Sequence, residues 1–246
     1  MMNKLKSIFE DARNDFIKCN AISKLASGDL TIPEYRSVLR QIFHHTRENP
    51  QLQALATVYF RGRQRDMVRP FLAHASSEIG HDQLALNDFV SLGGDPKHVE
   101  YENPHPATSA LLAYGFYQIY NLNPLGYLGY LFFLEFNGTA NGEPFMDSLR
   151  NIGVPDSAMT FLRDHAEIDI GHNKLMEKYV SHMINSQEDY DAIAYAMKTT
   201  GYLYGIMLDA AVANADNSVH FGWNWEELNA DDASPYATEE DVAAFK

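Results

Sequence analysis

Apolar residues recur every three to four positions along most of the chain, which is the spacing of one face of an α-helix. We see no alternation of apolar and polar residues long enough for a strand, so the sequence predicts an all-α fold. The expected helices lie at about residues 3–26, 33–49, 52–60, 66–92, 107–120, 125–139, 144–151, 156–184 and 187–215.

Several residues mark the expected ends of these helices. Gly28 should end the first, and the Thr31–Glu34 segment is typical of a helix N-terminus with a capping box. Gly93-Gly94 predicts a stop, residues 96–106 a proline-containing loop, and Asn141-Gly142 a turn before a short helix.

The helical spacing fails after Asn217, and the remaining residues are strongly acidic. No internal linker marks a boundary before that point. We therefore expect one domain at 1–217 and an acidic C-terminal tail at 218–246, whose beginning Trp223 and Trp225 pin to the domain.

Charge and cysteine content exclude several classes of function. The net charge is −14 and no basic run is present, which argues against a nucleic-acid partner, because binding phosphates requires clustered Lys and Arg. Cys19 is the single cysteine, so any metal must have nitrogen and oxygen ligands. No apolar run reaches the roughly 20 residues of a membrane span, and the N-terminus lacks the apolar core of a signal peptide. We expect a cytoplasmic protein without a membrane partner.

A group of polar residues occupies one face of the helix predicted at 156–184. His165, Asp169 and His172 are spaced four and three residues apart, which places all three on the same stripe. Upstream, His74, Glu78 and His81 have the same spacing and should form a second stripe on one helix.

A single acidic residue, Glu135, lies in an apolar helix of the predicted core. A buried carboxylate is costly unless it is compensated, and no Lys or Arg is near Glu135 in the sequence. Any one of these residues alone would be more typical of a satisfied core side chain. Together they predict a dinuclear site of iron or manganese inside a bundle, with Glu78 or Glu135 bridging. Zinc would tolerate the same ligands.

The ligand pattern can be compared with a known family. Glu78-x2-His81, Glu135 and His165-x3-Asp169-x2-His172 resemble the metal ligands of the heme-oxygenase-like diiron oxidases and oxygenases, and the resemblance extends over about residues 20–215. It implies a seven-helix bundle of the TenA/PqqC type that binds two Fe2+ ions and uses O2 through a peroxo-diferric species. His74 departs from this pattern, and we favour a role in orienting a ligand over direct coordination.

The substrate is less constrained than the metal. Within that superfamily the chain is most similar to the nitrile synthases, which implies an amino-acid substrate and conversion of 5,7-dibromo-L-tryptophan to 5,7-dibromoindole-3-carbonitrile. The alternative is cleavage of C–C or C–N bonds in another amino acid or a fatty acid. A substrate carboxylate would need a cation, and the candidates are Arg47, Arg61, Arg65 and Arg69.

Two other functions compete with a diiron enzyme. One is a non-redox member of the fold, either a thiaminase-like hydrolase or a binding protein; the hydrolase would need a catalytic cysteine, and Cys19 has no supporting motif. A heme enzyme would use His44 or His45 as the iron ligand, but heme has no use for the six-residue set, and the two histidines are better explained by helix packing. The sequence leaves the oligomeric state open, with a homodimer as one alternative.

Overall fold

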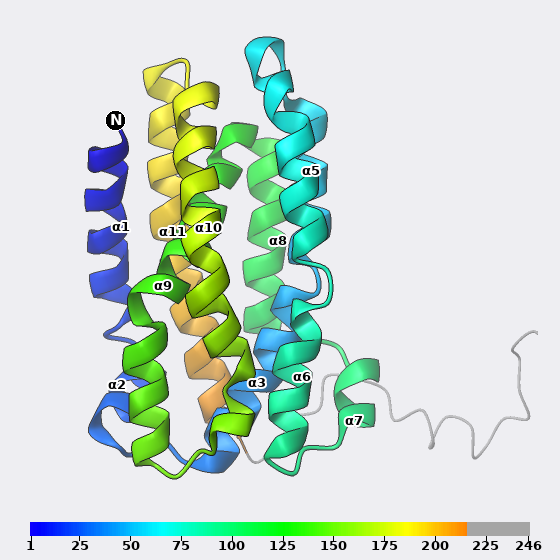
Figure 1. Cartoon of the computed structure of the whole chain (residues 1–246), viewed down its shortest axis with the longest axis vertical. Coiled ribbons are helices and arrows are strands. Elements are labelled where there is room, and N and C mark those ends of the chain that lie inside the picture. Colours follow the sequence, from blue (N-terminus) through cyan, green and yellow to red (C-terminus); the bar gives the residue numbers. More distant parts are fainter. Residues whose placement is uncertain (216–246) are drawn as a thin grey trace, which may run out of the picture.

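The computed structural model describes residues 1–215, apart from the side chains at positions 98, 101 and 167–170. Over that range the chain is helical and contains no strand, which confirms the all-α prediction (Figure 1). In chain order the α-helices are α1 (Met2–Phe16), α2 (Asn20–Ser27), α3 (Ile32–Thr46), α4 (Asn49–Ala56), α5 (Val68–Ser77), α6 (His81–Ser91), α7 (Pro96–Tyr101), α8 (Pro106–Asn121), α9 (Tyr127–Asn151), α10 (Thr160–Met183) and α11 (Gln187–Ala213).

The seven-helix bundle implied by the family resemblance therefore has too few helices for the described residues. The helix predicted at 3–26 is divided into α1 and α2, and the predicted loop at 96–106 contains α7. The acidic tail predicted at 218–246, including Trp223 and Trp225, lies outside the described residues.

The predicted boundary before α3 is confirmed, whereas α3 ends at Thr46 and not at the predicted residue 49. Gly28 ends α2 with a φ of 80°, a left-handed conformation that glycine adopts without a steric penalty. Thr31 accepts a hydrogen bond from the backbone N–H of Glu34, and the Glu34 carboxylate accepts one from the N–H of Thr31, which completes the capping box. These contacts fix the start of the helix that forms one wall of the interior.

The longest helices run side by side along the molecule (Figure 1). Helix α9 packs against α10 and α11, α1 packs against α11, and α3 packs against α6. Large aromatic side chains such as Phe132 and Phe133 of α9 are completely buried and touch Phe9 of α1. None of the described helices is long and apolar enough to cross a membrane.

Helix α9 continues through the turn that the sequence predicted at Asn141-Gly142. Asn141 is held by a hydrogen bond from Arg13 Nε at 3.0 Å and donates one to Asn137 at 2.7 Å. A Cβ at Gly142 would come within 2.9 Å of the Ala166 side chain, so glycine is needed here for the close approach of α10. These tertiary contacts keep Pro144 inside a helix that local propensity alone would end.

His44 and His45 of α3 are buried and are bound to protein partners. His44 lies 3.1 Å from the Glu102 carboxylate, which also forms an ion pair with Arg40, and His45 lies 2.7 Å from the hydroxyl of Tyr130. Burial, followed by the charges of Arg40 and Arg47, lowers the pKa of His44 to about 4. Arg40 already neutralises Glu102, so the carboxylate does not reverse this shift.

The His44 environment predicts a loss of stability in acid. The unfolded chain binds a proton at His44 below its ordinary pKa of 6.5, whereas the folded chain binds it only near pH 4. The free energy of unfolding should therefore fall by about 3 kcal/mol between pH 7 and pH 4 because of this residue. Urea titrations at several pH values, in the presence of a chelator, would measure the free energy of unfolding. His44→Gln should reduce its dependence on pH between pH 7 and pH 4. An unchanged pH dependence in that variant would contradict the role of His44.

Candidate metal centre

The first predicted ligand stripe is split by a break in the helix. We expected His74, Glu78 and His81 on one helix over 66–92, but α5 ends at Ser77 and α6 begins at His81. Gly80 has a φ of 99°, which a continuing α-helix cannot contain. Glu78 therefore follows the end of α5, and His81 is the first residue of α6. Its ring Nδ1 lies 3.0 Å from Glu78 Oε2.

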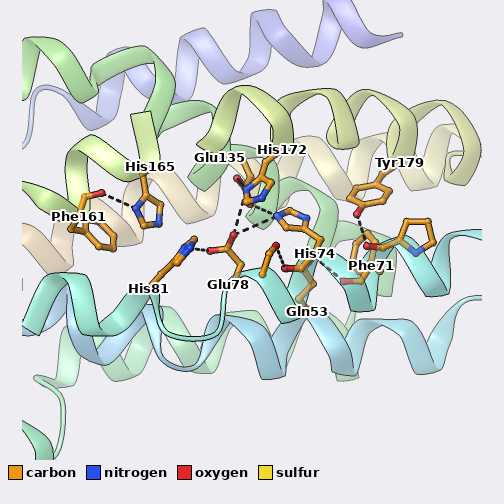
Figure 2. A network of polar contacts seen from close by, with 12 residues as sticks. Gln53, Phe71, His74, Glu78, His81, Glu135, Phe161, His165, His172 and Tyr179 are labelled. Carbon is orange, nitrogen blue, oxygen red and sulfur yellow. Dashed lines mark hydrogen bonds and ion pairs between the residues drawn. The ribbon is translucent and has the colours of Figure 1, made fainter. Parts of the chain in front are cut away.

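Four side chains from α5, α9, α10 and the break converge in the interior (Figure 2). His74 Nε2 lies 3.1 Å from Glu135 Oε1 and 3.8 Å from Glu78 Oε1. His172 Nδ1 lies 3.0 Å from Glu135 Oε2 and 3.4 Å from Glu78 Oε1. Two imidazoles and two carboxylates thus offer nitrogen and oxygen atoms within 4.8 Å of one another.

A second group shares Glu78 with the first. It consists of Glu78, His81 and His165, whose donor atoms also lie within 4.8 Å of one another. His165 Nδ1 donates to the carbonyl of Phe161 at 2.8 Å, which leaves Nε2 free to act as a ligand. The rings of His81 and His165 are 5.0 Å apart. Of the two carboxylates predicted to bridge, Glu78 is the one that belongs to both groups.

The electrostatics of the centre depend on pairing between carboxylates and imidazoles. Burial raises the pKa of Glu135, but hydrogen bonds and charge from His172 and His74 outweigh it and lower that pKa to about 2. The hydrogen bond to Glu78 raises the pKa of His81. Glu135 is therefore ionised at neutral pH and available as an anionic ligand.

Unpartnered polar atoms show that the donor set fits a cation. Among the described residues, Nδ1 of the buried His74 has no hydrogen-bond partner, and neither does Glu78 Oε1. Buried polar atoms of this kind are costly unless a partner satisfies them. A divalent iron or manganese ion accepts both donor types without sulfur. His74 lies within the donor group, although we had favoured an orienting role for it.

The structure brings together five of the six predicted ligands, namely Glu78, His81, Glu135, His165 and His172. The sixth, Asp169, is on α10, but its side chain is among those outside the description. Whether these residues bind metal stays a prediction.

A cavity of about 150 Å³ reaches the donor groups, and Glu78, Glu135 and His165 form part of its wall. Most of the other lining residues are apolar and come from α2, α3, α9 and α11. No Lys or Arg is among the described residues that line it. The predicted carboxylate partners Arg47, Arg61, Arg65 and Arg69 are therefore not on the cavity wall.

Sequence reasoning missed the polar residues on the α3–α4 side of this cavity. Thr46, Asn49 and Gln53 line it, and their spacing of three and four residues is a signal that could have identified them. Thr46 ends α3, whereas Asn49 and Gln53 belong to α4. The three residues therefore do not form one face of a single helix, and the sequence pattern was overlooked.

The break at Gly80 provides a test of how the two groups are positioned. Gly80→Ala places a side chain at a φ of 99°, and nothing lies within 4 Å of the added Cβ, so the cost is backbone strain of about 1–2 kcal/mol. We expect weaker metal binding together with this loss of stability. Thermal unfolding and metal titration measure the two effects. Gly28→Ala is the control, because Gly28 has a similar φ of 80° but lies at the end of α2. This variant should lose stability and keep its metal.

The chain is similar to a known protein family and to solved structures. The model of a family described as iron-containing redox enzymes matches residues 36–204. A crystal structure from Shewanella denitrificans, of a domain of unknown function with a heme oxygenase-like fold, is similar with a TM-score of 0.80. It shares 23% identity, and the match covers 97% of this chain and 99% of that one.

A second solved structure supports the same fold. A TenA homologue from P. horikoshii is similar with a TM-score of 0.64 and 14% identity, over 86% of this chain and 98% of that chain. No curated protein matches. The fold is therefore heme oxygenase-like, and at these identities the two structures say nothing of activity.

Proposed function

This chain belongs to the family of iron-containing redox enzymes, and we propose that within it the chain is an O2-dependent oxidoreductase with two iron ions. The observation that carries the proposal is the pair of donor groups that share Glu78. His74, Glu135 and His172 would hold one Fe2+ ion, and His81 and His165 the other. Asp169 stays a predicted ligand of the centre from its spacing in the sequence.

The iron ions would supply the activation of O2, and the chain's own residues would set where that chemistry takes place. Phe161 fixes the ring of His165 through its carbonyl, and the Glu78 contact fixes His81. The burial of Glu135 and His172 keeps bulk water away from the centre. The adjoining apolar cavity would hold the body of an organic substrate next to the irons.

The apolar wall supports a substrate with a hydrophobic body, which both predicted substrate classes possess. An aromatic amino acid offers a flat ring, and a fatty acid offers an alkyl chain. We retain the amino acid as the first candidate, and nitrile formation from 5,7-dibromo-L-tryptophan stays a prediction. No Lys or Arg is among the described residues that line the cavity, so the carboxylate of either substrate class would need the metal as its partner, and a fatty acid stays the second candidate.

Anaerobic reconstitution tests the proposal. The purified chain is loaded with Fe2+, its iron content is measured, and O2 is then added with a panel of tryptophans, other amino acids and lauric acid. We expect two irons per chain and substrate-dependent O2 consumption, with the product identified by mass spectrometry. A chain that holds no iron, or that consumes no O2 with any of these compounds, would contradict the proposal.

A further inference from the structure

Asp88 of α6 is a completely buried acid that caps the start of α10. It is 0% exposed. Its Oδ1 accepts hydrogen bonds from the backbone N–H of Thr160 at 3.0 Å and from the Thr160 hydroxyl at 2.6 Å, and its Oδ2 accepts one from the N–H of Phe161 at 2.9 Å. The first N–H groups of a helix have no acceptor within the helix, and Met159 at the N-cap of α10 provides none. The cap of α10 therefore comes from another helix.

Phe161 connects this cap to the second donor group. Its N–H donates to Asp88, and its carbonyl accepts from Nδ1 of His165 at 2.8 Å (Figure 2). The Phe161 and His165 rings also pack together, with their centroids 4.1 Å apart. Asp88 thus holds the backbone of the residue that orients the His165 imidazole.

Asp88 lies on the same helix as His81, the other imidazole of the second donor group. The two residues are seven positions apart, which places them on one face of α6, and α6 packs against α10. The rings of His81 and His165 are 5.0 Å apart. His172 of the first donor group is eleven residues beyond Phe161, about three turns further along α10. A loss of the cap should therefore affect the second group more than the first.

We propose that Asp88 is a positioning residue of the second metal site, which anchors the start of α10 to α6 and so fixes the separation of His81 and His165. The inference rests on the proposed function, because it takes the second donor group as a metal site. Without the carboxylate, buried N–H groups at the start of α10 lose their acceptors. The first turn of α10 can then shift, and the two imidazoles no longer hold the geometry that the ion requires.

Mn2+ titration of the metal-free full chain tests this role in Asp88→Asn. The variant keeps the shape of the side chain, but its NH2 group cannot accept from a backbone N–H. Mn2+ accepts the same nitrogen and oxygen donors as Fe2+. We expect wild type to bind two Mn2+ ions, and Asp88→Asn to retain the first and bind the second about tenfold more weakly. Electron paramagnetic resonance at two equivalents should show a spin-coupled pair in wild type and isolated Mn2+ in the variant.

A double-substitution cycle separates positioning from a general loss of stability. His165→Ala removes a ligand of the second group directly, so adding Asp88→Asn to it should not reduce Mn2+ binding further. A purely structural effect of Asp88→Asn would weaken both ions and would add to the effect of His165→Ala. Either of these results would overturn the proposal.

Asp189→Asn is the matched control. Asp189 accepts from the backbone N–H groups of Asn185 and Ser186 at 2.9 Å and 3.1 Å, and so caps the start of α11. Neither donor group has a member on α11 among the described residues. This variant should lose stability in urea with a chelator present, but keep both Mn2+ ions and the spectrum of the coupled pair. A loss of the second ion in Asp189→Asn as large as in Asp88→Asn would contradict the proposal.

A milder variant keeps the test decisive if Asp88→Asn does not fold. Thr160→Val removes only the hydroxyl contact at 2.6 Å and should weaken the second Mn2+ ion by about two- to threefold. An unchanged affinity for the second ion in a folded variant at either position overturns the role of Asp88 alone. A wild-type chain that binds fewer than two ions contradicts the two-iron function, and the role of Asp88 with it.

Discussion

Replacing His172 with alanine should remove metal binding and O2-dependent activity. His172 Nδ1 contacts both carboxylates of the first donor group, at 3.0 Å from Glu135 and 3.4 Å from Glu78. Without this imidazole the two acids lose a ligand partner and a hydrogen-bond donor at once. We expect metal affinity to fall by at least about 100-fold, with activity lost in proportion. Iron analysis after anaerobic reconstitution measures the first effect, and O2 consumption the second.

His182→Ala is the matched control on the same helix. His182 is exposed near the end of α10, where its Nδ1 contacts the carbonyl of Lys178. The same substitution there should leave iron content and activity at wild-type levels. Two irons per chain in the His172→Ala variant would show that His172 is not a ligand.

Much of the fold could be predicted because its signals are local. The stop at Gly28 and the capping box of Thr31 and Glu34 each depend on a few adjacent residues, and both are confirmed. The prediction of a turn at Asn141-Gly142 was wrong because the conformation of this segment depends on residues distant in sequence. Arg13 and Ala166 hold that segment in α9, and neither contact can be read from the segment itself.

The candidate site shows the same division between local and distant information. Helical spacing placed His165 and His172 on one face, and the cost of a buried acid drew attention to Glu135. The break at Gly80 was missed because the His74–His81 spacing also fits an unbroken helix. The orientation of the Gln53 side chain, which lines the cavity, could not be predicted either, because its amide donates to the carbonyl of Phe71 on another helix.

Glu135→Gln should separate the stability of the metal-free protein from its response to metal. The substitution keeps the shape of the side chain but removes its negative charge, and the new amide would place a donor near His74 or His172. Glu135 is 6% exposed, so bulk water cannot interact with the metal in place of the lost carboxylate. We expect the variant to lose high-affinity metal binding and the O2-dependent absorption change of the Fe2+-loaded protein.

Thermal and urea unfolding with and without Mn2+ provide the decisive comparison. A ligand that binds only the folded state at 100 times its Kd stabilises that state by about 2.7 kcal/mol. Wild-type protein should show a gain of this size, and Glu135→Gln should show almost none. Glu143→Gln, at an exposed position of the same helix, should retain the full gain. Equal stabilisation of wild type and Glu135→Gln would mean that the cation binds elsewhere, because a lost charge inside the donor group must weaken the linkage between metal and folding.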